Sequence, residues 1–215
     1  MRRRRSAAPG PREVTVLYKT LPHYRVEFFE HLRTALEQDG VRLRLLVGQP
    51  DSSQRMKGDT ASIAWAEEIR NRYVRLGHRT LVWQPIRRQL RTTDLVIVEQ
   101  ASRLLVNNVL MVWRVVGGPR LANWGHGINL DRRLASTLGE RWKRLVLRRC
   151  DWWFAYTSST LRILMDAGYP PGQVTVVQNA IDTHALRSAR RQLPATAAAD
   201  VCAELGIESE HVGLY

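Results

Sequence analysis

The chain has 215 residues, of which 44% are hydrophobic and 25% are charged. This balance is typical of a folded domain and excludes a disordered chain, and every apolar run falls short of the roughly 20 residues that cross a bilayer. The 33 Lys and Arg residues outnumber the 20 Asp and Glu residues, and the net charge of +13 predicts attraction to phosphates on a nucleotide, an anionic lipid or a nucleic acid.

The start of the chain, MRRRRSAAPGPRE, is positively charged like a secretory signal but lacks the apolar segment that such a signal needs. We therefore expect residues 1–12 to form a disordered basic tail and the protein to stay in the cytoplasm. Cys150 and Cys202 are too few for a disulfide framework and lack the spacing of a metal site, which agrees with a reducing compartment.

The spacing of apolar residues predicts that strands and helices alternate along most of the chain. In chain order we expect a strand at 14–18, a helix from 24 to 40, a strand at 41–48, a loop at 49–67, two short elements at 70–76 and 80–85, a strand at 94–100, a helix at 102–116, a strand at 120–124, a helix at 132–149, a strand at 151–157, a helix at 158–168 and a strand at 173–179. Beyond Asp182, two helical pieces flank Pro194, and the closing HVGLY is typical of a strand that has just begun.

Strands that are apolar on both faces and alternate with helices indicate a Rossmann-like, doubly wound α/β fold, with a mainly parallel sheet and helices on both faces. Ligands of such sheets bind outside the carboxyl ends of the strands. The segments that directly follow the strands are therefore the candidate ligand-binding segments: KTLPHYR, EQASR, GHGIN, TSST and NAIDT.

Four stretches of the sequence together resemble a known family. LYKTLPHYRVEFFEHL, NWGHGIN, RCDWWFAYTSSTLRILMDAGYPPGQVTVVQNAIDT and the closing HVGLY are similar to the N-terminal half of glycosyltransferase family 4, the retaining enzymes with two facing Rossmann-like domains known as the GT-B fold. The resemblance implies an N-terminal, acceptor-side domain at 13–182, followed at 183–215 by linker helices and the start of a second domain. In the family that second domain holds most of the nucleotide-sugar donor, through a basic pair and a glutamate-rich signature that have no counterpart here.

The resemblance therefore implies half of a hexosyltransferase-type enzyme, inactive as an isolated chain. Its donor would be a nucleotide sugar, and its acceptor a glycan or lipid-linked glycan in cell-surface polysaccharide or glycolipid synthesis. We expect no cofactor and no metal, because the sequence has no Asp-X-Asp motif and no His/Cys cluster and because the family generally does not need a divalent ion.

His126 is the first candidate site residue, flanked by Gly125 and Gly127 directly after a predicted strand. Glycines let the backbone approach a ligand closely and adopt positive φ. By resemblance, His126 corresponds to the family's active-site histidine near the donor sugar, where sugar transfer passes through an oxocarbenium-like state that nearby groups stabilise. The alternative is a turn histidine whose ring bonds to the backbone.

A second group of candidate residues lies at or after the ends of the predicted strands 14–18 and 94–100. Tyr24 and Arg25 lie at the start of a helix, where a guanidinium and free backbone amides favour a phosphate. A solvated surface arginine is the alternative for Arg25, and His23 and Lys19 are weaker candidates. Gln100 and Arg103 also lie on the ligand side, whereas we expect a structural hydrogen bond for the neighbouring Glu99.

Other polar residues at the strand ends are expected to be structural. Thr157, Ser158 and Ser159 are typical of a helix cap, and Asp182 or Thr183 of the cap of the next helix. Asn179 and Asp182 would shape the crossing toward the second domain. None of these residues is expected to be catalytic.

The predicted helix 132–149 has basic residues around an apolar stripe formed by Leu134, Leu138, Trp142 and Leu145. Either its basic flank is simply solvated, or the helix docks on anionic lipid at the inner face of a membrane. Two rival functions stay open: a basic nucleic-acid-binding domain, although the sequence has no zinc spacing and no RNP-like pattern, and a stand-alone acceptor-binding subunit without activity. We expect no nucleic-acid partner.

Overall fold

The computed structural model of the chain describes residues 12–77, 79–101, 103–127 and 149–208. Two compact units follow one another, Met1–Ala180 and Ile181–Tyr215. The predicted tail (apart from Arg12), the predicted helix at 132–149 (apart from Arg149) and the closing HVGLY lie outside the described residues.

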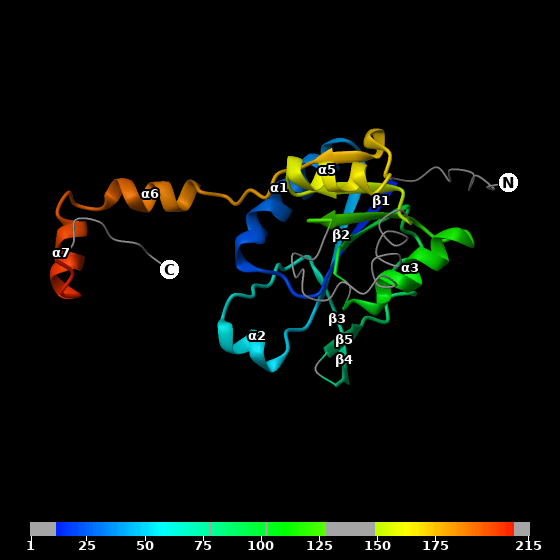
Figure 1. The fold of residues 1–215 in the computed structure, drawn as a ribbon, viewed down its shortest axis with the longest axis horizontal. Coiled ribbons are helices and arrows are strands. Elements are labelled where there is room, and N and C mark those ends of the chain that lie inside the picture. Colours follow the sequence, from blue (N-terminus) through cyan, green and yellow to red (C-terminus); the bar gives the residue numbers. More distant parts are fainter. Residues whose placement is uncertain (1–11, 78, 102, 128–148, 209–215) are drawn as a thin grey trace. The chain divides into compact units, whose positions relative to one another are not determined.

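A seven-stranded sheet forms the first unit, and all its pairings are parallel (Figure 1). Its strands stand in the order β3-β2-β1-β6-β7-β8-β9. They are β1 (Arg12–Tyr18), β2 (Val41–Gly48), β3 (Glu67–Ile69), β6 (Leu95–Glu99), β7 (Arg120–Gly125), β8 (Trp152–Ala155) and β9 (Val174–Val176). The chain winds outward from β1 in one direction and from β6 in the other, which confirms the predicted doubly wound fold.

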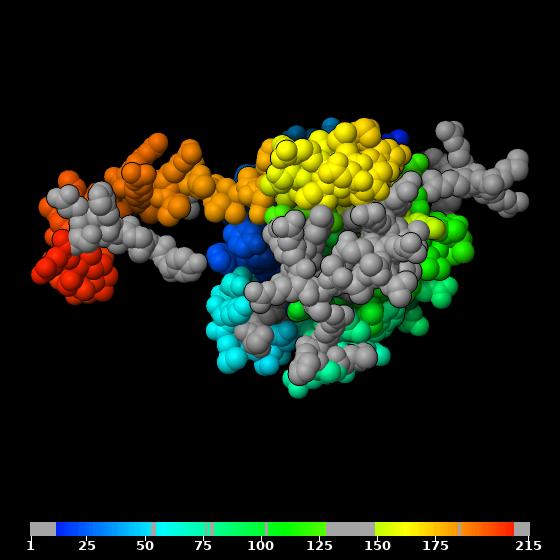
Figure 2. Space-filling view, in the orientation of Figure 1, coloured from blue at the N-terminus to red at the C-terminus, as the bar shows by residue number. Residues whose placement is uncertain are grey.

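Helices cover both faces of the sheet, because successive side chains of each strand point to opposite faces. On one face, Val16, Tyr18 and Trp124 pack with Phe29 of helix α1 (Val26–Gln38). On the other face, Leu110 of α3 (Leu105–Val115) and Leu164 of α5 (Ser158–Asp166) join the buried side chains. Figure 2 shows the yellow segment that contains α5 at the surface of the first unit.

The remaining elements are short. A 3-10 turn, η1 (His23–Arg25), precedes α1, helix α2 spans Ser52–Lys57, and η3 (Pro171–Gln173) leads into β9. The two short elements predicted at 70–76 and 80–85 are β4 (Arg72–Leu76) and β5 (Arg79–Trp83), which pair antiparallel as a separate two-stranded sheet. The prediction of a plain loop at 49–67 is wrong, because this region contains α2 and the first residue of β3. The second unit contains α6 (His184–Gln192) and α7 (Ala197–Glu204).

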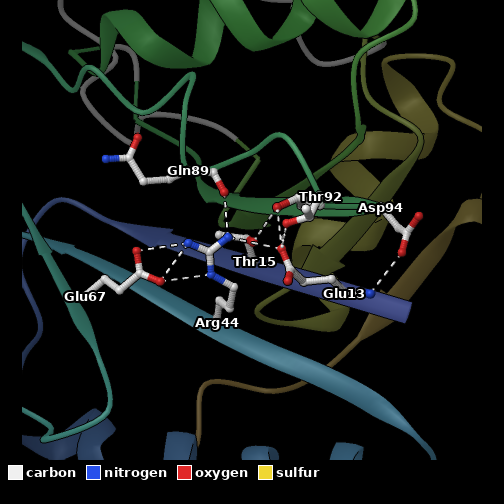
Figure 3. Close-up of polar contacts among 8 residues, drawn as sticks. Glu13, Thr15, Arg44, Glu67, Gln89, Thr92 and Asp94 are labelled. Carbon is white, nitrogen blue, oxygen red and sulfur yellow. Dashed lines mark hydrogen bonds and ion pairs between the residues drawn. The ribbon is translucent and has the colours of Figure 1, made fainter. Parts of the chain in front are cut away.

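A polar network crosses the sheet near the amino ends of its strands. Figure 3 shows the Arg44 guanidinium between the carboxylates of Glu13 and Glu67, at 3.1 Å and 2.7 Å. Thr92 donates a further hydrogen bond to Glu13 at 2.8 Å. Burial opposes the ionised form, but the bonds from Thr92 and Arg44 hold the pKa of Glu13 below its ordinary value. The network joins β1, β2 and β3 to the segment that leads into β6.

Candidate functional site

The carboxyl edge of the sheet gathers aromatic and polar residues where the direction of winding changes. β1 and β6 are neighbours here, with Leu17 paired to Val98, and Glu99 pairs with Trp124 of β7. Tyr18 at the end of β1 therefore lies beside Glu99. In doubly wound sheets this reversal point is where ligands bind. We call the ends of β1, β6, β7 and β8, with the residues that follow them, the carboxyl rim.

Arg25 is enclosed in this rim and is only 3% exposed. Its Cζ lies 5.2 to 5.9 Å from the centres of four rings, which are those of Tyr24, Phe28, Trp124 and Tyr156. The alternative of a solvated surface arginine is therefore wrong: turn η1 places the guanidinium against the sheet face that α1 covers, where the ring faces attract it. Contact between Arg25 and a phosphate stays a prediction.

The Arg25 guanidinium also reaches the segment that leaves the sheet after β9. Its Nη2 donates a hydrogen bond of 2.6 Å to Oδ1 of Asn179, 154 residues away in the chain. The preceding residue, Gln178, has a φ of 59°, which is strained for a side chain other than glycine. The bond from Arg25 thus helps to hold a turn that backbone preference alone would not favour.

His126 is exposed and stands on the rim beside Tyr156. The two ring centres are 4.6 Å apart in an edge-to-face arrangement, and the same Tyr156 ring faces the Arg25 guanidinium at 5.7 Å. Two predicted residues that are far apart in the sequence, Arg25 and His126, therefore contact the same ring. Within the part of the chain that the structure describes, the His126 ring has no hydrogen bond.

The turn around His126 is built by its two glycines and Gln100. Gly127 has a φ of 76°, and its N–H donates to Oε1 of Gln100 at 3.1 Å. A Cβ on Gly125 would lie 3.0 Å from the Cβ of Gln100, so close packing favours a glycine there. The Gln100 side chain thus positions the histidine turn; direct contact between Gln100 and a substrate stays a prediction.

The remaining predicted residues of this group have different surroundings. Tyr24 is 45% exposed and packs edge-to-face on His23. Arg103 is exposed, and the contact described for it is its carbonyl, which accepts a hydrogen bond from the N–H of Val82. The structure therefore places Arg25 and His126 against Tyr156, and Tyr24 against Arg25, while Arg103 is not among the residues in contact there.

Glu99 differs from its predicted structural role. Among the described residues no hydrogen bond reaches its carboxyl group; the bond at this residue is from Asn107 Nδ2 to the Glu99 carbonyl, at 2.9 Å. Burial raises the pKa of the Glu99 carboxyl, although Lys19 and Arg25 oppose that shift. A half-buried carboxyl that has no hydrogen bond among the described residues, at a ligand-binding edge, is a candidate contact for a substrate hydroxyl.

The sequence did not single out three aromatic residues of the rim, Tyr18, Trp124 and Tyr156. Tyr18 is 3% exposed, and burial raises its pKa. Trp124 is 5% exposed, and its buried Nε1 has no partner among the described residues. Each lies at a strand end or just beyond one, which is the signal that could have marked it.

The loop after β1 is anchored by a buried amide. Asn71 donates to the carbonyls of Lys19 and Gln49, at 2.9 and 2.8 Å, and accepts from Gln84 at 2.9 Å. Gly48 leaves room for this amide, because a Cβ there would overlap it. The start of the rim segment 19–25 is therefore fixed to the ends of β2 and of the β4–β5 hairpin.

Two predicted helix caps are confirmed. The Thr157 hydroxyl accepts a hydrogen bond from the N–H of Thr160 at 3.2 Å, at the start of α5. In the second unit, Oδ1 of Asp182 accepts from the N–H of His184 at 2.7 Å, at the start of α6. Of the two residues proposed for that cap, Asp182 supplies the bond.

Within the described ranges, no three His, Cys, Asp or Glu side chains lie close enough together to hold a metal ion. Among the helices that the structure describes, none has both the length and the apolar character needed to span a bilayer.

Comparison with known structures identifies the fold. The Anabaena protein Alr3699/HepE, solved in complex with UDP-glucose, matches with a TM-score of 0.52 and 14% identity, over 92% of this chain and 50% of its own. UDP-GlcNAc 2-epimerase from Neisseria meningitidis matches with a TM-score of 0.50 and 10% identity, over 92% of this chain and 55% of its own. The chain spans about half the length of the structures it matches.

Comparison of sequences gives the family. No curated protein matches the chain. The sequence model of Glycosyltransferase Family 4, however, matches residues 27–185, which is more than half of the chain and includes the histidine turn, Glu99 and the segment up to Asp182. The fold, the rim and this match agree, and the chain belongs to glycosyltransferase family 4.

Proposed function

We propose that this chain is the acceptor-side half of a retaining, hexosyl-transferring glycosyltransferase. It would move a sugar from a nucleotide-sugar donor to a glycan or lipid-linked glycan, in cell-surface polysaccharide or glycolipid synthesis, without a cofactor or metal. The observation that carries the proposal is the exposed His126 ring, which stands on Tyr156 beside the buried Arg25, at the edge where doubly wound sheets bind ligands.

In this proposal each rim residue has a chemical task. Breaking the bond at the anomeric carbon develops positive charge on the sugar ring. The imidazole of His126 can donate to or accept from a sugar hydroxyl, and because it is already placed on Tyr156 it needs little reorganisation. Glu99, whose carboxyl has no described partner, would bind a second hydroxyl. Gly125, Gly127 and Gln100 hold the turn from which His126 acts.

The donor class is supported by the proteins that share the fold. Alr3699/HepE was solved with UDP-glucose, and the Neisseria epimerase was solved bound to UDP-GlcNAc. We propose that this protein also takes a nucleotide sugar, held mainly by residues outside this chain, while Tyr24, Arg25 and Arg103 lie toward the acceptor or a phosphate. The reaction would take place in the cytoplasm, at the inner face of a membrane.

Sugar transfer tests the proposal directly. The native protein that contains this chain would be incubated with radiolabelled UDP-glucose, UDP-N-acetylglucosamine or GDP-mannose and with glycan and glycolipid extracts of the cell. We expect one donor to label an acceptor, and we expect the isolated 215-residue chain to label none. A native protein that transfers no sugar from any of these donors, or that only isomerises the donor, would contradict the proposal.

A further inference from the structure

The amino edge of the sheet, opposite the carboxyl rim, carries a row of exposed arginines. Arg12, Arg42 and Arg120 lie at or next to the starts of β1, β2 and β7, and Arg91 and Arg149 lie in the segments that lead into β6 and β8. We call these five residues the arginine edge. Since they span the strand order β2-β1-β6-β7-β8 and neighbouring strands lie about 4.8 Å apart, the edge is about 20 Å wide.

The carboxylates around this edge already have other partners. Glu13 and Glu67 bind Arg44, and Asp151 binds Arg114, with 2.5 Å between Nε and Oδ2. Asp94 accepts a hydrogen bond from the N–H of Glu13. Within the described residues, none of the five edge arginines has an ion pair. The exposed Glu37 and Asp39, at the C-terminal end of α1, leave the charge of this edge positive.

Exposed valines lie next to the arginines. Val112, Val115 and Val116, at the C-terminal end of α3, are 67%, 66% and 75% exposed. The bond between Arg114 and Asp151 holds this helix end at the amino edge, and the chain then reaches Arg120 within four residues. The same end of the molecule is therefore both cationic and apolar.

This combination favours one kind of anionic partner. Basic residues alone attract nucleic acid and anionic lipid alike. Proteins that hold single-stranded nucleic acid add aromatic side chains on which bases stack, whereas exposed aliphatic side chains gain free energy by entering the boundary between lipid head groups and acyl chains. We propose that the arginine edge, with Val112, Val115 and Val116, is a docking surface for an anionic lipid bilayer.

Apart from Arg149, the surface shares no residue with the predicted lipid-binding helix at 132–149, and it does not depend on sugar transfer. β1 runs seven residues from this edge to the carboxyl rim, a length of about 23 Å. A docked protein would hold the His126 rim about that far from the lipid phosphates.

Vesicle binding tests the surface. The full chain would be mixed, in 0.1 M NaCl, with vesicles of 30% phosphatidylglycerol in phosphatidylcholine, or with vesicles of phosphatidylcholine alone, and the bound fraction measured by flotation. We expect binding to the anionic vesicles only. Arg42→Gln with Arg120→Gln should lower the partition coefficient about 25-fold, because each basic residue near the surface contributes about 1 kcal/mol, or about 5-fold. Val115→Ser with Val116→Ser should lower it as well.

A matched pair of substitutions distinguishes binding through the arginine edge from attraction by the net charge of the protein. Arg55→Gln with Arg75→Gln removes the same charge from exposed positions on α2 and β4, and should change the partition coefficient less than 5-fold. Equal losses in the two arginine pairs, no effect of the valine pair, or no binding to anionic vesicles would each overturn the proposal. So would tighter binding to a single-stranded RNA through the same arginines. Circular dichroism would confirm that each variant is folded.

Discussion

Replacing Arg25 by methionine tests whether the rim is held together by the buried guanidinium. Methionine keeps most of the volume and removes the charge, the hydrogen bond to Asn179 and the attraction to four rings. A hydrogen bond from a charged group contributes about 1.5–3 kcal/mol, and each cation–π contact about 0.5–1 kcal/mol. The variant also avoids the cost of burying a charge, which is several kcal/mol. We therefore expect a net loss of about 2 kcal/mol in the free energy of unfolding.

Urea unfolding of wild type, Arg25→Met, Asn179→Ala and the double variant measures the loss of stability and the part of it that comes from the Arg25–Asn179 hydrogen bond. We expect the two single changes to be coupled by about 1.5 kcal/mol, the share of the hydrogen bond. Arg33→Met is the control: that exposed arginine faces one ring, Trp65, with its Cζ at 4.9 Å, and its loss should cost less than about 1 kcal/mol. A cost below about 0.5 kcal/mol for Arg25→Met, or additive single changes, would refute the reasoning.

Three further predictions concern the surroundings of the rim. Gly48→Ala should destabilise the protein by about 3 kcal/mol, because the new Cβ displaces the buried Asn71 amide and its hydrogen bonds, whereas Gly172→Ala, with open space around it, should be nearly neutral in the same urea titration. Thr157→Ala should cost about 1 kcal/mol in thermal unfolding, the usual value of a lost helix cap. Glu99→Gln should stabilise the protein at pH 8 but not at a pH below 4.5, the ordinary glutamate pKa. Because the pKa of Glu99 is raised in the folded state, protonation favours the folded state. Ionising Glu99 therefore costs stability as the pH rises through its folded-state pKa. A melting-temperature gain that is the same at pH 4 and pH 8 would contradict this.

The alternation of strands and helices could be predicted from the sequence because most strands of the sheet contain an apolar run and helices α1, α3 and α5 each carry an apolar stripe. The β4–β5 hairpin could not be recognised as a separate sheet, since Arg72 and Arg75 interrupt its apolar pattern. Helix α2 escaped prediction because its residues, Ser52–Lys57, are polar and show no stripe.

The site was predictable residue by residue only where local chemistry marks it. The two glycines marked His126, and the hydroxyl before a helix marked Thr157 as a cap. The enclosure of Arg25 depends instead on the strand order β1-β6-β7-β8, which brings Trp124 and Tyr156 to a residue about 100 or more positions away. In the sequence those aromatic residues resemble ordinary core residues.

The proposed role of His126 is tested most directly by the effect of His126→Ala on turnover and on stability, in the native protein that contains this chain. The exposed ring contributes one edge contact with Tyr156, so the free energy of unfolding should change by less than about 1 kcal/mol. If the imidazole stabilises the sugar in the transition state, kcat should fall about 100-fold or more. Unchanged kcat and KM, or a loss of activity that only follows a loss of folded protein, would contradict the claim that His126 faces the sugar.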